Sequence, residues 1–389
     1  MNMSSTRTVS PAAAYQQKVL VLQGGGALGA YQAGAYQALA EAHIEPDWVA
    51  GISIGAINAA IIAGNEPEDR VAKLTAFWET IGVEFPMDSI LPKHFSSGRE
   101  FKQASSLWSI MLGVPGFFTP RFPVPWLQKY GSDEAASFYD THPLRQTLLH
   151  FVDFDRINAG KTRLSVGAVD VETGNFRYFD NQEPGRTWRF GPEHVMASGA
   201  LPPGFPSIEI DGRHYWDGGL VSNTPLQQVL IRGAAVDTVV FQVDLFNSHG
   251  EIPGNLEEVE ERRKDITYSS RTRMITDAFL ERHKLRRSIA TLLEKLPADA
   301  LDGEERDELS GMSADYSVTL IHLIHRSKNR AIHSKDYEFS RVSMHQHWEA
   351  GIEDGRKALK AEDWRIPPDA LDGLAVYDID RPISLQDWQ

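Results

Sequence analysis

"KVLVLQGGGALGAYQAGAYQALAEA", residues 18–42, contains the clearest signal of the fold class. Its first six residues form an apolar run that ends in glycines, which is typical of a strand buried on both faces. The alanine-rich segment after the glycines has apolar residues at helical spacing. A second apolar run, PDWVAGIS at 46–53, leads directly into the helical pattern IGAINAAIIAG at 54–64. This β-α-β-α opening predicts a parallel sheet covered by helices.

The rest of the chain continues the alternation of strands and helices. Further strands are expected at 162–171, 176–180, 209–219, 236–246 and 316–326, the first two joined by an ETGN turn. Helical patterns cover residues 256–296 and 340–360, whereas the acidic stretch 298–309 is typical of a linker or surface loop. We expect residues 1–16 to be a disordered lead-in. The tail is expected to be folded, with its strand completing the same sheet.

The composition limits the partners and the chemistry of the protein. The chain has 53 acidic and 39 basic side chains, a net charge of −14, which disfavours binding to nucleic acid. Cysteine is absent, which excludes disulfides, thiolate zinc sites and a cysteine nucleophile. Neither an export signal nor an apolar run of ~18 residues is visible, so we expect a cytoplasmic protein.

A G-x-S-x-G motif, GISIG, lies where the second strand turns into a helix. Gly51 and Gly55 allow a sharp turn of the backbone. They place Ser53 at the N-terminal end of a helix, whose dipole favours the negative charge that develops in acyl transfer. The alternative is a serine that only caps the helix. The strand before the motif and the helix after it favour Ser53 as a nucleophile.

A base for this serine is expected at the end of another strand. In the stretch HYWDGGL, Asp217 ends an apolar strand, and Gly218 and Gly219 leave its carboxylate accessible. The alternative is a turn aspartate, because Asp-Gly is a common turn signal. None of the 13 histidines stands in a comparable setting, although a Ser-His-Asp triad would be the ordinary arrangement.

The glycine loop itself fits the dinucleotide pattern G-x-G-x-x-G through Gly24, Gly26 and Gly29. That fold needs an acidic residue at the carboxyl end of the following strand. Asp47 lies at about the right distance, but it precedes the apolar run and so lies at the wrong end of the strand. We therefore interpret the loop as an oxyanion hole, in which the amides of Gly24 to Gly26 face the oxyanion formed by attack of Ser53.

The motifs GGGALG, GISIG and DGG, in this order, make the chain similar to the patatin-like phospholipases, serine acyl hydrolases with a Ser-Asp dyad. The segments GAINA, after the elbow, and ASGALPPGFPSIEIDGRHYWDGGLVSNTPL, around the aspartate, extend the resemblance. It implies Ser53 as the nucleophile, Asp217 as its base, and Gly24, Gly25 and Gly26 as the oxyanion loop. It also implies a three-layer α/β/α sandwich with a mainly parallel central sheet.

The resemblance also implies how the chain is divided. Residues 17–246 correspond to the patatin-like catalytic domain, and residues 247–389 to a mainly helical C-terminal extension that packs on it and is similar to that of certain bacterial members. One position departs from the pattern: the family's glycine loop usually carries Arg or Lys where this chain has Leu28. The loss of this cation disfavours an anionic headgroup, although not hydrolysis itself.

An apolar insertion separates the elbow from the aspartate. Residues 103–128 hold one charged side chain, Arg121, among many aromatic residues and prolines. Because prolines prevent one continuous helix from hiding these side chains, we expect part of the insertion, including Phe117 and Phe118, to form an apolar lid or lipid-docking surface. The alternative is a segment packed on the core.

Other polar residues do not suggest a second site. His322 and His325 lie three apart on a predicted strand, so they would face opposite sides and disfavour a metal site. Asp170, near a turn, is expected to be structural. We expect no cofactor and no metal.

The sequence thus favours an esterase that acts on lipid-type acyl esters through a Ser-Asp dyad. Two alternatives remain: a hydrolase of hydroxyacyl polyester or its oligomers, and a membrane-associated adaptor with a vestigial site. The expected partners are a lipid or acyl-ester substrate and, through residues 103–128, a membrane or lipid aggregate. The sequence leaves a homo-oligomer open.

Overall fold

The computed structural model describes residues 10–84, 99–232, 236–297, 299–326, 335–369 and 372–379. The strands of the main sheet are β1 (Gln17–Leu22), β2 (Trp48–Gly51), β5 (Arg163–Asp170), β6 (Phe176–Asp180), β7 (Ile208–Ile210), β8 (Arg213–Asp217), β9 (Thr238–Asp244), β10 (Val318–Ile324) and β11 (Leu374–Asp378). Two short strands, β3 (Thr119–Pro120) and β4 (Tyr139–Asp140), pair separately. The helices are α1 (Gly29–Glu41), α2 (Ile54–Ala63), α3 (Pro67–Ile81), α4 (Arg99–Leu112), α5 (Asp133–Ala136), α6 (His142–Phe151), α7 (Phe154–Asn158), α8 (Pro192–Ser198), α9 (Leu226–Arg232), α10 (Leu256–Tyr268), α11 (Thr272–Lys295), α12 (Gly303–Met312) and α13 (Arg341–Lys360).

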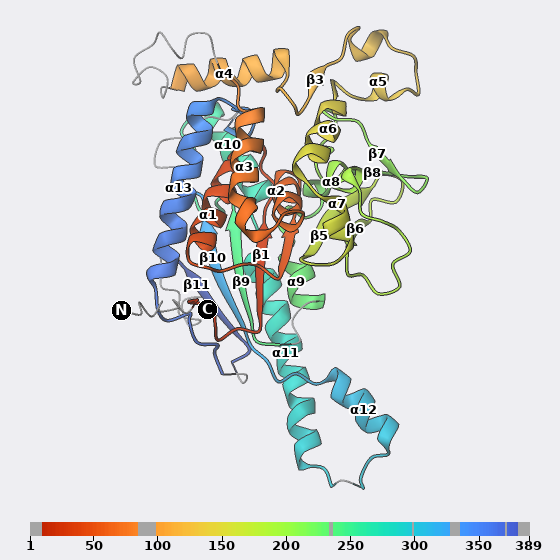
Figure 1. The fold of residues 1–389 in the computed structure, drawn as a ribbon, viewed down its shortest axis with the longest axis vertical. Helices are drawn as coiled ribbons and strands as arrows, with labels where there is room; N and C mark the ends of the chain where they lie inside the picture. Colours follow the sequence, from red (N-terminus) through yellow and green to blue (C-terminus); the bar gives the residue numbers. More distant parts are fainter. Residues whose placement is uncertain are drawn as a thin grey trace, which may run out of the picture.

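All described strands except β3 and β4 form one mainly parallel sheet (Figure 1). Its order is β11-β10-β9-β1-β2-β5-β8-β7, and β6 pairs with β5. The pairs from β11 to β5 are parallel, whereas β6, β7 and β8 form antiparallel pairs. The expected mainly parallel sheet is therefore confirmed.

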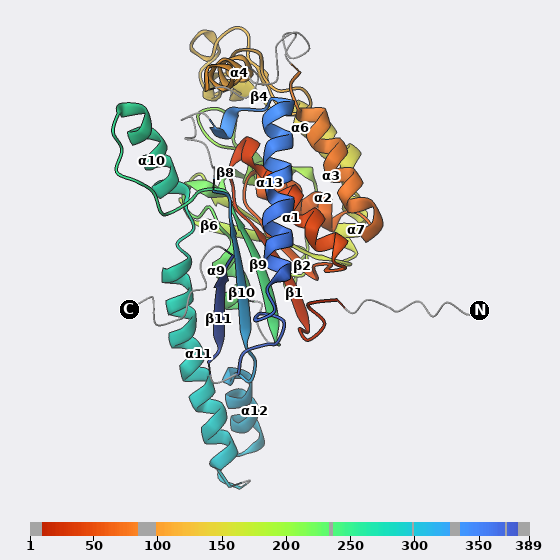
Figure 2. The ribbon, with the colours of Figure 1, turned by 90° about the vertical axis from the view of Figure 1, so that its left-hand side faces the viewer.

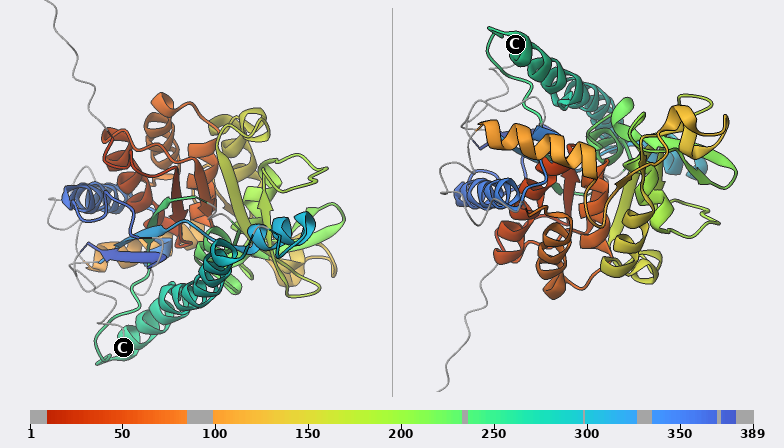
Figure 3. Two further views of the ribbon diagram at one scale, coloured as in Figure 1. Left: turned by 90° about the horizontal axis from the view of Figure 1, so that it is seen from below. Right: turned by 90° about the horizontal axis from the view of Figure 1, so that it is seen from above.

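Helices cover both faces of this sheet and complete three layers. Successive residues of β1 point to opposite faces, so Leu20 and Leu22 join one buried cluster with α1, α2 and α3, while Val19 and Val21 join another with α9 and α11. Figure 3 shows the red-orange helices α1–α3 and the teal helix α11 on opposite sides of the sheet. The expected α/β/α sandwich is confirmed.

The register of the central strands brings the two candidate catalytic side chains to one edge. Gly51, the last residue of β2, pairs with Val166 of β5. Two residues further along β5, Ala168 pairs with Asp217, the last residue of the antiparallel strand β8. The end of β8 therefore meets the carboxyl end of β2. Asp170, at the end of β5, accepts hydrogen bonds from the turn that follows, which agrees with a structural role.

The C-terminal part of the chain belongs to the same sheet. Strands β10 and β11 follow β9 in parallel, so the sheet continues past the expected domain boundary at residue 246. Helix α13 packs so closely on α1 that a Cβ on Gly34 or on Gly351 would lie 2.0 Å from a carbonyl oxygen of the facing helix. The extension is thus joined to the first part of the chain through both a strand and a helix.

The lead-in differs from the expectation. Residues 10–16 are folded rather than disordered, and residues 1–9 lie outside the described part. Tyr15 is buried, and its hydroxyl donates to the Trp364 carbonyl and lies at hydrogen-bond distance, 2.8 Å, from the Thr319 hydroxyl. The apolar ring and the two hydrogen bonds give this segment enough contacts to order it.

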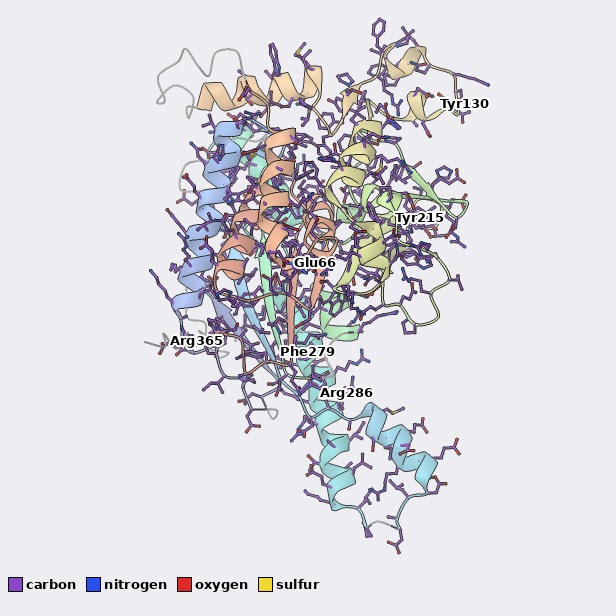
Figure 4. All side chains as sticks on the ribbon, viewed as in Figure 1. Glu66, Tyr130, Tyr215, Phe279, Arg286 and Arg365 are labelled. Carbon is purple, nitrogen blue, oxygen red and sulfur yellow. The ribbon has the colours of Figure 1, made fainter. Side chains whose placement is uncertain are left out.

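Helices α11 and α12 project beyond the sheet at the end opposite α4 (Figures 1 and 2). Figure 4 labels Arg286 where α11 leaves the body of the molecule, and its guanidinium donates to the Ser313 carbonyl beside α12. The acidic stretch expected to be a loop therefore contains a helix. Asp302 and Glu305 form a capping box at its start, which satisfies the first amides of α12.

Candidate active site

A cavity of about 330 Å³ lies at the carboxyl edge of the sheet. The candidate residues from three separate motifs all contribute to its wall: Gly24, Gly25, Gly26, Ser53 and Asp217. Most of the other side chains that line it are aliphatic or aromatic. The cavity therefore combines a few polar groups with a large apolar surface, which is the usual character of a site for an organic ligand.

Ser53 lies on a strained turn between β2 and α2. Its backbone has φ 54° and ψ −124°, which a residue with a side chain rarely adopts. The turn is so tight that a Cβ on Gly51 would lie 2.2 Å from the Gly55 carbonyl oxygen, and one on Gly55 would lie 2.4 Å from the Leu22 carbonyl oxygen. The Ser53 amide donates to the Ser198 hydroxyl at 3.0 Å. This is the geometry that exposes a nucleophile at the tip of an elbow.

Asp217 is held in a form suited to accept a proton. Its side chain is 2% exposed, and burial raises its pKa to about 7, against hydrogen bonds from the Gly219 amide and Ser53 that lower it. The Gly219 amide donates to the carboxylate at 2.7 Å. A Cβ on Gly218 would lie 2.6 Å from the Gly167 carbonyl oxygen, so a glycine is needed where β8 passes β5.

The three glycines of the loop differ in whether their backbone amides are already hydrogen-bonded within the protein. The Gly24 amide donates to the Asn223 carbonyl at 3.1 Å, so this amide is already used within the protein. The expectation that Gly24 contributes an oxyanion donor is corrected on this point, because one N–H donates poorly to two acceptors. Gly25 and Gly26 supply the next two amides, and Gly26 has the positive φ of 55° that favours glycine.

Buried amide side chains hold this loop. Asn223 donates to the Gly24 carbonyl at 3.0 Å and to the Tyr268 carbonyl at 2.9 Å. Gln23 donates to the same Tyr268 carbonyl at 3.0 Å, and Gln32 donates to the Gln23 carbonyl at 2.6 Å. The position of the loop is therefore fixed by side chains whose roles no local sequence motif indicates.

The dinucleotide interpretation finds no support in this geometry. Gly29 packs against α2, where its Cβ would lie 2.5 Å from the Ile54 side chain. Asp47 forms an ion pair with Lys18 at 3.0 Å, at the start of β1 and β2 and thus at the far end from the glycines. An acidic side chain at that end cannot bind a ribose beside the loop.

Histidines lie away from the cavity in the part of the chain that the structure describes. His322 hydrogen bonds to the Asp244 carboxylate at 2.5 Å, whereas His325 contacts His347 at 3.1 Å. The two side chains thus have separate partners. Within the described ranges, no group of three His, Asp or Glu side chains is arranged to hold a metal ion.

Several cavity residues come from the C-terminal extension, and no sequence motif indicates them. Lys264, Tyr268, Asp336, Tyr337 and Phe339 all line the wall beside the glycine loop. Leu28, at the position where the family usually has a cation, is fully buried in the core, so the loop itself contributes no charge. Lys264 places a cation in the cavity from a different part of the chain.

Comparison with known proteins agrees with this arrangement. The family model described as Patatin-like phospholipase matches residues 20–230, which is more than half of the chain. The chain belongs to the patatin-like phospholipase family. A second model, described as Patatin phospholipase, matches residues 266–371, so much of the C-terminal extension of this patatin-like phospholipase is itself a recognised element. The family is one of carboxylic ester hydrolases.

Individual relatives are distant. Lysophospholipase NTE1 from two strains of Cryptococcus neoformans is 27% identical over 228 residues, which are 59% of this chain. The match spans only 11% of the length of these proteins. Among solved structures, VipD from Legionella pneumophila has 16% identity and a TM-score of 0.36, covering 89% of this chain and 67% of that one. Human GIVD cytosolic phospholipase A2 has 11% identity and a TM-score of 0.38, covering 88% and 60% respectively.

Proposed function

We propose that this protein is a serine acyl hydrolase that cleaves carboxylic esters of lipid type through Ser53 and Asp217. The observation that carries the proposal is the strained elbow of Ser53, which shares a mainly apolar cavity with the buried carboxylate of Asp217. A carboxylate with a raised pKa accepts a proton more readily than an ordinary one, so it serves as a general base without a histidine.

The proposed reaction has two steps. Asp217 takes the proton of the Ser53 hydroxyl while the oxygen attacks the ester carbonyl, and the amides of Gly25 and Gly26 bind the resulting oxyanion. Collapse returns the proton to the leaving alcohol and leaves an acyl-enzyme. Asp217 then takes a proton from water as the water oxygen attacks the acyl-enzyme, and collapse breaks the bond to Ser53, returns the proton from Asp217 to the Ser53 oxygen and releases the free acid.

The proposed substrates are lipid acyl esters, with a lysophospholipid as the first to test. The apolar wall of the cavity suits an acyl chain, and curated relatives of the family bear the name lysophospholipase. Leu28 gives the glycine loop no cation, and Lys264, which lines the same cavity, is paired with the Asp336 carboxylate at 2.7 Å.

A substrate panel tests this choice. Initial rates would be compared on a lysophospholipid, a diacyl phospholipid, a neutral monoacyl ester and hydroxybutyrate oligomers, with the Ser53→Ala variant as the blank. We expect the acyl lipids to be cleaved fastest. Faster cleavage of the hydroxybutyrate oligomers would instead assign a polyester hydrolase, and no reaction with any of these substrates or with a fluorophosphonate probe would indicate an adaptor.

The pKa of Asp217 predicts the pH dependence of hydrolysis. The base works only when ionised, and its pKa is raised to about 7. On a short soluble ester, kcat/KM should therefore rise about tenfold per pH unit from pH 5 to near 7 and then level off. The melting temperature, measured over the same range, separates this effect from unfolding. A midpoint near pH 4, or constant kcat/KM from pH 5 to 8, would contradict a base buried in this way.

The insertion after the elbow divides into an inward and an outward part. Helix α4 places Ser105, Ser106 and Ser109 inward, and Ser105 donates to the buried carboxylate of Glu338 at 2.5 Å. Its apolar side chains face outward, with Met111 72% exposed. A helix normally buries its apolar face, so this reversed polarity leaves an apolar surface to be covered by another apolar phase.

Neighbouring residues extend this outward surface beside the cavity. The exposed apolar set, called here the outer surface, consists of Leu107, Trp108, Ile110, Met111, Leu112, Phe122, Val124, Trp126, Leu127 and Tyr130. Figures 1 and 2 show α4 across one end of the molecule, and Figure 4 labels Tyr130, two residues after the insertion, at the same end. Ile110 also lines the cavity, so the surface and the site are continuous. We infer that the outer surface contacts a lipid aggregate or membrane, and that the protein is cytoplasmic and binds the lipid surface peripherally.

Phe117 and Phe118 are not part of the outer surface, contrary to expectation. They are 7% and 3% exposed, line the cavity and pack on Phe205. The chain turns inward here because Gly113 and Gly116 adopt φ of 83° and 67°, which bring the two rings under α4. Serine at both positions would therefore lower the melting temperature and affect every substrate.

The exposed residues give the sharper test of lipid contact. Replacing Met111 and Trp126 together by serine should weaken binding to phosphatidylcholine vesicles about 100-fold or more, because each large apolar side chain contributes about 1.5–3 kcal/mol when buried. Rates on a short soluble ester and the melting temperature should not change. Binding should persist in high salt, since the contact is apolar and the net charge is −14.

A matched control is available at the opposite end of the molecule. Leu285 on α11 is 68% exposed, and Leu285→Ser should leave vesicle binding unchanged. Equal vesicle binding by the wild type and the Met111→Ser, Trp126→Ser variant would contradict the proposed contact.

Within the described residues, no helix is long and apolar enough to cross a bilayer.

A further inference from the structure

A short segment of the C-terminal extension presses on the glycine loop. Residues 335–339, called here the strap, begin with a turn of 3-10 helix at Lys335–Tyr337. A Cβ on Gly26 would lie 2.2 Å from the carbonyl oxygen of Asp336, so the strap lies in direct contact with the loop backbone. Tyr337 and Phe339 of the strap line the cavity beside Ser53.

The strap is tied to helix α10 by one ion pair. The Lys264 ammonium lies 2.7 Å and 3.0 Å from the two carboxylate oxygens of Asp336. The two side chains are only 17% and 14% exposed, so water and salt screen their attraction weakly. The ammonium also lies 5.1 Å from the centre of the Tyr337 ring, which adds a second contact to the strap.

Helix α10 is fixed to the other side of the same loop. Tyr268, four residues after Lys264 and so on the same face of the helix, accepts hydrogen bonds on its carbonyl from Gln23 and Asn223. Asn223 also bonds the Gly24 carbonyl. The loop is therefore held between the last turn of α10 and the strap, and the Lys264–Asp336 pair closes the connection between them.

We propose that Lys264 and Asp336 are positioning residues, through which the C-terminal extension holds the Gly25 and Gly26 amides in place to bind the oxyanion. The inference rests on the proposed hydrolase function. Oxyanion stabilisation depends on donors that are already in place before reaction, and a displacement of about 1 Å is enough to cost about 100-fold in rate. Since Leu28 gives the loop no charged anchor, the ion pair supplies one from outside it.

A positioning role differs measurably from contact with the substrate. If Lys264 only holds the loop, its loss lowers kcat for every ester and leaves KM unchanged, because the transition state gains the oxyanion contact and the bound ester does not. If Lys264 binds a phosphate headgroup instead, its loss raises KM for phosphate-bearing lipids alone.

The test uses the full chain and a short soluble ester without phosphate. Lys264→Met and Asp336→Asn should each lower kcat about 10- to 100-fold with KM within about twofold of the wild type. Their rates of labelling by a fluorophosphonate should fall in parallel. Lys264→Arg, which keeps the cation, should restore most of the rate. Arg287→Met, which breaks the Arg287–Asp315 pair of α11 away from the cavity, should retain wild-type kcat.

The neutral double variant, Lys264→Met with Asp336→Asn, keeps the test decisive if a single variant fails to fold because of its unpaired buried charge. Its kcat should fall as far as in the single variants, because the two residues act as one unit. Wild-type kcat in the double variant would overturn the proposal, as would a loss confined to KM for lysophospholipid. A wild type that neither hydrolyses esters nor reacts with the fluorophosphonate would overturn the hydrolase function itself, which is a distinct result.

Discussion

Ser53→Ala should lower the hydrolysis of a short soluble ester by about 10³-fold or more, the largest loss expected of any single substitution in this chain. The substitution removes the attacking oxygen, and no neighbouring hydroxyl is on the elbow to replace it. The fold should be unchanged, because alanine keeps the Cβ of Ser53 and removes only the hydroxyl oxygen. The measurement is kcat/KM at pH 8, with circular dichroism as the check on folding.

A matched serine controls for general effects of the substitution. Ser288 lies on α11, where its hydroxyl donates to the Lys284 carbonyl of the same helix. Ser288→Ala should retain wild-type activity. More than a trace of hydrolysis by folded Ser53→Ala would mean that another residue is the nucleophile.

Asp217→Asn should lower kcat about 10³-fold, nearly as much as the serine change, because the amide cannot accept the serine proton. Its oxygen can still accept the Gly219 hydrogen bond, so the turn should keep its shape. No single histidine substitution should match this loss in a folded protein, since no described histidine lines the cavity. A dead but folded His→Ala variant beside an active Asp217→Asn variant would indicate a conventional triad.

The same substitution should not cost stability at alkaline pH. Burial raises the pKa of Asp217 from 3.8 to about 7 in the folded protein. Between pH 3.8 and about 7, the folded state therefore binds more protons than the unfolded state. The contribution of the Asp217 carboxyl group to the free energy of unfolding is complete below pH 4 and is lost as the pH rises through 7. The substituted amide carries no charge, so the Asp217→Asn variant should melt at or above the wild-type temperature at pH 8. A melting temperature many degrees lower would show that the carboxylate holds the fold together.

The parts of the account that the sequence predicts are those with local signals. The first strand, the glycines and the alanine-rich helix follow each other within 25 residues. This alternation of strand and helix predicts a parallel sheet covered by helices. The elbow of Ser53 is likewise a short motif between a strand and a helix. Asp217 can be placed beside it because the ends of neighbouring strands meet at one edge of a sheet, although no local signal indicates that its strand is antiparallel.

The remaining features depend on contacts between distant parts of the chain. Lys264 and Asp336 are 72 residues apart, and neither position shows a pattern that points to the glycine loop. The inward turn of Phe117 depends on backbone angles at two glycines, and the use of the Gly24 amide depends on Asn223, 199 residues away. Apolar composition alone cannot separate the buried aromatic residues of the insertion from those on its outer surface.

Reaction of the intact protein with a fluorophosphonate, followed by mass mapping of the labelled peptide, should identify the nucleophile. We expect one adduct per chain, on Ser53 in the GISIG segment, formed slowly in Asp217→Asn and absent from Ser53→Ala. A protein that hydrolyses the ester but carries its adduct on any other residue would contradict this expectation.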